Sequence, residues 1–129
     1  MLREIKQVRQ VKGEGTRRWF QDPYFDLIIW YDEDGSLIGF QLCYDKQGRE
    51  RAFTWRRNHE CRHDIVDGGD LPGHSKMAPV IVADASSPDE HVAERFLKES
   101  THIDPELARL VYDKISRYLS WIEEIDYVF

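Results

Sequence analysis

The chain has 129 residues, of which 41% are hydrophobic and 33% charged, and 18 Lys and Arg against 24 Asp and Glu give a net charge of −6 at pH 7. The length fits one domain over residues 1–129, and the composition excludes a disordered chain. The acidic total argues against a protein that coats a nucleic-acid backbone, because such proteins need a basic face. Residues 1–20 are locally basic, so a local contact with an anion stays open, although charge runs of this kind are more often solvated.

The first twenty residues predict a strand, a turn and a second strand. Ile5, Val8 and Val11 have a spacing that would suit a helix. Their β-branched side chains, and the sequence GEGT at 13–16, favour the two strands instead.

From residue 25 onward the sequence predicts a meander of antiparallel strands. Runs of aromatic and β-branched residues predict strands at 25–31, 37–44, 50–57 and 61–66. The sequences DEDGS at 32–36 and DKQGR at 45–49 predict tight turns, because Asp and Gly supply local hydrogen bonds and positive φ. Turns this short make neighbouring strands antiparallel.

The predicted strands at 25–31 and 37–44 each have one strongly apolar face. Its residues are Phe25, Leu27, Ile29 and Tyr31 on the first strand and Ile38, Phe40, Leu42 and Tyr44 on the second. We expect helices to cover this face. The second face is mixed and carries Trp30, so we expect it to be the concave side of a curved sheet, a subunit contact or a ligand surface. Gly39, in mid-strand, predicts curvature or the close approach of another group.

A further strand is predicted at 77–85, followed by two helices. The first helix spans 87–100 and begins with a capping box, in which Ser87 is the N-cap, Pro88 follows and Glu90 reaches back.

The second predicted helix, at 104–125, begins with Asp104 as N-cap and Pro105 after it. One stripe along it is apolar and predicts a core contact: Leu107, Leu110, Val111, Ile115, Tyr118, Leu119 and Ile122. The predicted fold is therefore α+β: a curved antiparallel sheet of about five to seven strands in a meander, with two C-terminal helices packed on one face.

The sequence NHECRHDIVDGGDLPGHS at 58–75 concentrates residues that carry chemistry. Its H-x-C-x-H run at 59–63 places three potential metal ligands, His59, Cys61 and His63, on one strand face, but neighbours in such a set lie roughly 6.6 Å apart. One metal ion therefore needs a further ligand from the following loop, such as Asp67, Asp70 or His74. Nothing in the spacing demands that arrangement, so we predict no metal and no cofactor.

The glycine-rich part of this stretch, GGDLPGHS at 68–75, has the spacing of a phosphate-binding loop. His74 stands where that loop needs its lysine, and the segment leads into a predicted strand rather than a helix. Both departures exclude the phosphate-binding loop, which requires a helix N-terminus and the lysine.

A small histidine-dependent hydrolase is one of two functions that the sequence allows. His63 would be the general base, Asp67 or Asp70 would orient its imidazole, and Lys76 would offset charge on a transferring group. Neighbouring arginines would make such an enzyme phosphodiesterase- or nuclease-like. The common nucleophile, zinc and dinucleotide motifs are absent from the sequence.

A non-catalytic module that binds a small ligand or a protein is the function that we favour. Aromatic side chains offer a large contact area at low entropic cost, so the residues that we expect to bind the ligand are Trp30, Trp55, Arg57 and His74. A half-apolar second face is costly to leave in water, and a homodimer is therefore expected. Neither a membrane nor nucleic acid is expected as a partner.

The location that we expect is the cytoplasm. No apolar run approaches the roughly 18 residues that a membrane span needs, and the first ten residues lack the apolar region of a signal peptide. The two cysteines, Cys43 and Cys61, do not make a disulfide framework and are expected to be reduced thiols.

The runs RRWFQDPYFDLIIWYDEDG and GFQLCYDKQGRERAFTW, together with DGGD and KMAPVIVAD, resemble a group of short bacterial hypothetical proteins. The resemblance covers most of the chain. It implies a cytoplasmic bacterial α+β domain, and it assigns no activity and no catalytic residue.

Overall fold

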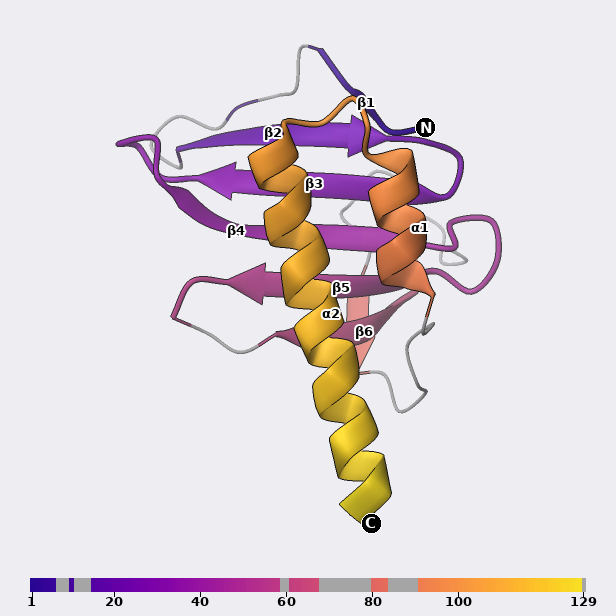
Figure 1. Ribbon diagram of the computed structural model, residues 1–129. Coiled ribbons are helices and arrows are strands. Elements are labelled where there is room, and N and C mark those ends of the chain that lie inside the picture. The colour runs from indigo at the N-terminus through magenta and orange to yellow at the C-terminus, as the bar shows by residue number, and fades with distance from the viewer. Residues whose placement is uncertain (7–9, 11–14, 59–60, 68–79, 84–90, 129) are drawn as a thin grey trace.

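One antiparallel sheet carries two helices on one of its faces (Figure 1). The structure, a computed structural model, describes residues 1–6, 10, 15–58, 61–67, 80–83 and 91–128, and of 65–67, 80–83 and 122–128 it describes the backbone alone. The seven strands pair in chain order. They are β1 (Arg3–Glu4), β2 (Thr16–Gln21), β3 (Phe25–Tyr31), β4 (Leu37–Tyr44), β5 (Arg51–Arg56), β6 (Arg62–Asp67) and β7 (Val80–Ala83). This arrangement confirms the predicted α+β meander.

The strand boundaries follow the predicted turns closely. β3 and β4 have the predicted bounds, and β5 and β6 differ from theirs by one residue at each end. In the first turn Gly35 has a φ of 86°, and its N–H donates to the carbonyl of Asp32 at 2.9 Å. In the second turn the positive φ, 59°, belongs to Asp45, a residue type that tolerates the left-handed region.

The apolar face of the sheet packs against α1 (Val92–Glu99) and α2 (Pro105–Val128). Figure 1 shows both helices in front of the sheet, with α2 crossing the strands. The largest fully buried side chains come from both layers: Tyr44, Phe20, Phe25, Phe40, Phe96, Leu2, Leu27, Ile29, Leu42, Ile115 and Val111. The prediction that helices cover the face of Phe25, Leu27 and Ile29 is therefore correct, and the burial of this apolar area is the main favourable term in folding.

The start of α1 differs from the prediction. The helix begins at Val92, and His91 precedes it without a side-chain capping bond. Because His91 is not helical, the predicted helix over 87–100 is too long at its N-terminal end. The predicted capping residues Ser87, Pro88 and Glu90 lie outside the described residues.

The predicted second helix is confirmed, and it continues three residues beyond its predicted end to Val128. Leu107, Val111 and Ile115 of the apolar stripe are buried in the core, while Leu110 is only half-buried. Ala108, which lies outside the predicted stripe, is buried as well. The C-terminal end of α2 extends past β6 in the view of Figure 1, and β7 is the edge strand on that side of the sheet.

Gly39 sits where neighbouring backbone comes close, as the sequence predicts. It pairs with Trp30 of β3 on one side and with Arg56 of β5 on the other. A Cβ atom at this position would collide with the carbonyl oxygen of Trp55 and would lie 2.9 Å from Cα of Arg56. Backbone atoms cannot move aside as a flexible side chain does, so only glycine fits here.

Gly39→Ala therefore tests the register of the central strands. We expect the variant to lose about 1–3 kcal/mol of unfolding free energy, because the added methyl group pushes β4 away from β5. Urea unfolding followed by circular dichroism measures this. Gln41→Ala, on the same strand and face, is the control and is expected to cost less, and equal losses in the two variants would contradict the predicted clash.

Candidate functional site

His63 lies in the core beneath α2 and not on an open surface. It pairs with Phe53 of β5, and only 8% of the residue is exposed. The Tyr44 hydroxyl and Nε2 of His63 share a hydrogen bond of 2.5 Å. The imidazole ring lies between two tyrosine rings, with centroid distances of 5.7 Å to Tyr44 and 6.3 Å to Tyr118. Its surroundings are those of a satisfied core histidine.

Arg62, the residue before His63 in sequence, points to the other side of the sheet. Residues 62 and 64 flank His63 on β6, and side chains alternate between faces along a strand. Arg62 accordingly forms an ion pair of 3.2 Å with Asp64 on the second face. The sequence interpretation placed the general base beside cations on a solvated sheet surface. Arg62 lies on the other face, whereas Arg51 stays on the side of His63, with its guanidinium carbon 4.8 Å from the centre of the Tyr44 ring.

Most of the predicted catalytic group lies outside the described side chains. Asp67 ends β6 and only its backbone is described, while Asp70, His74 and Lys76 are not described at all. Within the described residues, no group of three or more His, Cys, Asp or Glu is placed to hold a metal ion. In the same part of the chain, no helix is long and apolar enough to cross a membrane.

Of the residues predicted to bind a ligand, the structure describes Trp30, Trp55 and Arg57, and it places Trp30 and Trp55 on opposite faces of the sheet. Trp55 faces the helices, where its ring lies 5.9 Å from that of Phe40 and Nζ of Lys114 sits 4.8 Å above it. Trp30 lies on the second face. Arg57 follows β5 and is held by the first turn, through an ion pair of 2.8 Å with Asp32.

Trp30 instead has Arg56 as its partner, with the guanidinium carbon of Arg56 4.6 Å from the centre of the indole ring. The register explains this contact, because Arg17, Trp30, Gly39 and Arg56 follow one another across β2, β3, β4 and β5. Gly39 has no side chain to separate Trp30 from Arg56. The sequence analysis identified Trp30 and Gly39 but not Arg56, because the contact between Trp30 and Arg56 depends on the register of strand pairing.

A second polar cluster lies at the end of the β4–β5 hairpin, on the same face. Nζ of Lys46 contacts the carboxylate of Asp26 at 3.0 Å. Burial raises the pKa of Glu50, and the charge of Asp26 adds to this effect.

Burial, helped by the charges of Glu50 and Asp26, raises the pKa of the Cys43 thiol to about 12. A thiol that stays protonated is a poor nucleophile, so Cys43 is an inert core residue.

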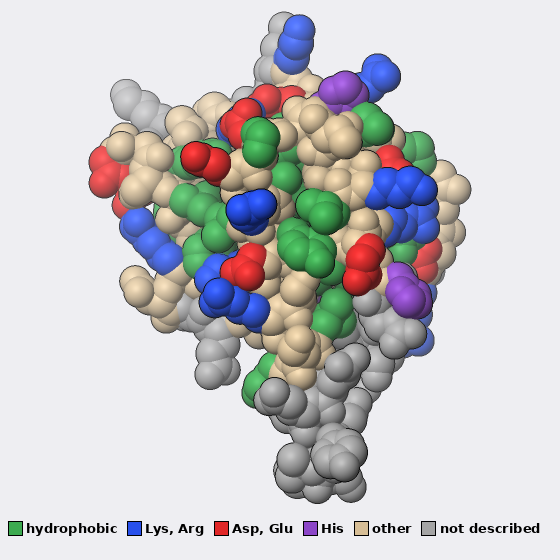
Figure 2. Space-filling view, in the orientation of Figure 1, with side chains coloured by type: hydrophobic (Ala, Val, Ile, Leu, Met, Phe, Trp, Pro, Cys, Tyr) green, Lys and Arg blue, Asp and Glu red, His purple; other side chains and the backbone are tan. Residues whose placement is uncertain are grey.

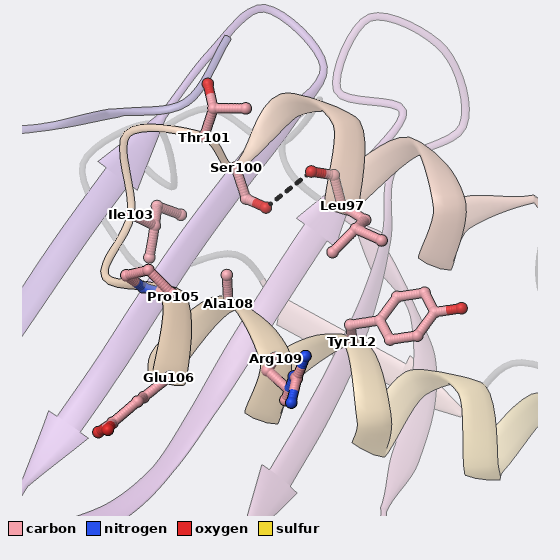
Figure 3. A pocket seen from close by; sticks show the side chains of 9 residues that line it. All are labelled: Leu97, Ser100, Thr101, Ile103, Pro105, Glu106, Ala108, Arg109 and Tyr112. Carbon is pink, nitrogen blue, oxygen red and sulfur yellow. Dashed lines mark hydrogen bonds between the residues drawn. The ribbon is translucent and has the colours of Figure 1, made fainter.

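A groove between the two helices is the site that sequence reasoning missed. Its volume is about 610 Å³, and it lies around the α1–α2 connection (Figure 3). Nine residues line it: Leu97, Ser100, Thr101, Ile103, Pro105, Glu106, Ala108, Arg109 and Tyr112. Figure 2 shows hydrophobic side chains gathered on this face between charged ones.

The floor of the groove is apolar and its rim is polar. Ile103 and Ala108 are buried at the floor, whereas Leu97 on α1 is 48% exposed. Ser100 does not offer its hydroxyl to the groove, because Oγ donates to the carbonyl of Leu97 at 3.1 Å. Arg109 projects from α2 at the mouth (Figure 3) and has no ion pair within the described part of the chain. The feature of the sequence that could have indicated the groove is Leu97, an apolar residue next to the core residue Phe96 on α1.

No protein-family model, curated protein or solved structure is significantly similar to this chain. The geometry of the chain itself therefore carries every functional statement that follows.

Tyr44→Phe tests whether His63 is a structural residue. Removing the hydroxyl leaves a buried imidazole nitrogen without this partner, so we expect a loss of about 1–3 kcal/mol in the free energy of unfolding. Tyr44→Phe combined with His63→Leu should recover part of the loss, because both polar groups are then gone. Urea unfolding measures each variant. Tyr112→Phe, on the rim of the groove, is the control and should change stability by less than about 0.5 kcal/mol. A Tyr44→Phe effect as small as the control's would contradict the assignment.

Proposed function

We propose that the protein is a non-catalytic binding module that takes a small ligand or a segment of a partner protein in the groove between α1 and α2. The groove itself is the observation that carries this proposal. Its volume of about 610 Å³ lies within the range of roughly 300–1,000 Å³ that is usual for ligand sites. Such sites combine an apolar lining with a few polar groups, as the floor and rim of this groove do.

Leu97 supports the proposal because of its position. It is one of three large hydrophobic residues that are exposed in the described part of the chain, with Met1 and Trp121. In the groove it lies close to buried apolar surface, so an occupant would remove a connected apolar area from water. Arg109 and Tyr112 at the mouth add a cation and an aromatic ring, which give such an occupant orientation.

The histidine-dependent hydrolase, which the sequence hypothesis describes as phosphodiesterase- or nuclease-like, has less support. A general base must come within hydrogen-bond reach of the proton that it removes from a substrate. His63 is 8% exposed, and its Nε2 is engaged with the Tyr44 hydroxyl. Binding without chemistry requires no rearrangement of this pair.

A cytoplasmic location and a homodimer are further parts of the proposal. Neither Cys43 nor Cys61 forms a disulfide, which suits a reducing compartment. The second face gives a homodimer little support, since two copies meeting there would bring Arg17 and Arg56 of each chain together. The exposed apolar residues of the helix layer, Leu97 and Trp121, are the better candidates for a contact between copies.

The amphiphilic fluorophore 1-anilinonaphthalene-8-sulfonate, with aromatic rings and one sulfonate, probes the groove directly. Leu97→Asp places a charge in the groove without disturbing the core. We expect this variant to bind the fluorophore about tenfold more weakly than the parent, because burial of a leucine side chain contributes roughly 1.5–3 kcal/mol. Fluorescence titration measures the affinity, and an unchanged melting temperature shows that the fold is intact.

Trp121→Asp is the matched control for this experiment, because Trp121 is exposed to a similar degree, 53%, but does not line the groove. It should bind the fluorophore as the parent does. Equal loss in both variants, or loss in neither, would mean that the groove is not the binding site.

A further inference from the structure

Three arginines and two tryptophans gather on the second face of the sheet, which is turned away from the viewer in Figure 1. One row across the strands is Arg17, Trp30, Gly39 and Arg56. The neighbouring row is Trp19, Ile28, Gln41, Thr54 and Arg62. We call the set formed by Arg17, Trp19, Trp30, Arg56 and Arg62 the tryptophan–arginine patch.

The patch is the accessible part of this face. Arg56 is exposed, 66% of the Arg62 side chain is exposed, and Arg17, Trp19 and Trp30 are half-buried. The next row along the strands is closed, because Cys43, Ala52 and Asp64 are all buried. A ligand on this face therefore meets the two rows with arginines and tryptophans, and not the row with buried small and acidic residues.

The aromatic rings of the patch are held in place. Trp30 lies against the guanidinium of Arg56 at 4.6 Å, across the gap that Gly39 leaves. The indole N–H of Trp19 donates to the carboxylate of Asp26 at 3.4 Å. Lys46 pairs with the same carboxylate and offsets its charge at the border of the patch. Rings that are already fixed lose little entropy when a ligand binds.

We propose that the tryptophan–arginine patch binds single-stranded nucleic acid. Unpaired bases stack on aromatic rings and on guanidinium planes, which Trp19, Trp30 and Arg56 provide. Arg17 and Arg62, at opposite ends of the patch, suit the phosphates on either side. Gln41 and Thr54, bonded to each other at 3.1 Å between the tryptophans and Arg62, supply an amide and a hydroxyl for base edges.

Charge and chemistry select this occupant over the alternatives. Another copy of the chain would bring a second set of arginines to the patch. An acidic peptide would satisfy the arginines but would offer the tryptophans no bases to stack on. A duplex keeps its bases paired and stacked, so the rings could not reach their faces.

The tryptophan–arginine patch is a local exception to the acidic net charge of the chain. A net charge of −6 still argues against coating a long nucleic acid, and the patch has room for only a few nucleotides. The expected binding is therefore weak, in the range of roughly 10⁻⁴ to 10⁻⁶ M that is usual for contacts without sequence preference, and sensitive to salt. Binding of nucleic acid at the patch is a function beyond the one proposed above, and it uses the side of the sheet opposite to the helix groove.

Fluorescence anisotropy with a labelled oligothymidylate of about ten nucleotides tests the inference on the full chain. Trp30→Leu keeps the apolar bulk but removes the indole, and we expect it to weaken binding by about fivefold or more, as the loss of one stacked base does. Arg56→Gln should also weaken binding, because it removes a guanidinium plane on which a base stacks. Arg62→Gln should lower the slope of log affinity against log salt by about 0.7, the share of one phosphate contact.

Two variants on α2 serve as matched controls, Trp121→Leu and Arg117→Gln. Trp121 is 53% exposed, and the Arg117 side chain is 73% exposed, so both remove the same residue types from the opposite side. Neither should change the affinity for the oligonucleotide. The melting temperature of every variant is measured alongside, and Arg56→Gln, at an exposed site, keeps the test valid if Trp30→Leu is destabilised.

Three results would overturn the inference. One is the absence of binding at low salt, and another is binding that the patch variants leave unchanged. The third is equal binding of poly-glutamate with the same dependence on Arg56, which would assign the patch to acidic peptides instead. None of these results touches the helix groove, which the Leu97 variant tests separately.

Discussion

The alternation of side chains along the paired strands determines where every polar group of this protein lies. On β5 and β6, Phe53 and His63 face the helices, while Thr54, Arg62 and Asp64 face the other way. The register is fixed because the helix-facing positions fill a core of fully buried aromatic and aliphatic side chains, and a slip by one residue would turn these side chains to solvent. The same constraint puts His63 in the core and leaves Trp30 beside Arg56.

The two sides of the sheet consequently offer different chemistry. The helix layer presents an apolar groove with a polar rim, and the second face presents aromatic rings with cations. Between them lies the hydrogen bond of Tyr44 with His63, whose two polar atoms satisfy each other in the core. Neither Tyr44 nor His63 belongs to the groove or to the second face, so binding on either side requires no change in this pair.

Much of the fold followed from local sequence patterns. The turns at 32–36 and 45–49, the apolar face of β3 and β4, the close approach at Gly39 and the extent of α2 were all predicted, since each depends on residue types a few positions apart. The site was predicted less well. Tyr44 lies 19 residues from His63, and Arg56 reaches Trp30 only through the pairing of three strands. The groove needs the relative placement of two helices, which no local pattern gives.

The burial of His63 separates a binding module from a histidine-dependent hydrolase most directly. Carbethoxylation by diethyl pyrocarbonate, mapped by mass spectrometry, reports which imidazoles are accessible in the folded protein. We predict that the exposed residues His91 and His102 react in the folded state, while His63 reacts only after urea has unfolded the chain. Modification of His63 in the folded protein as fast as that of His91 would contradict the account and return the histidine to the candidate catalytic residues.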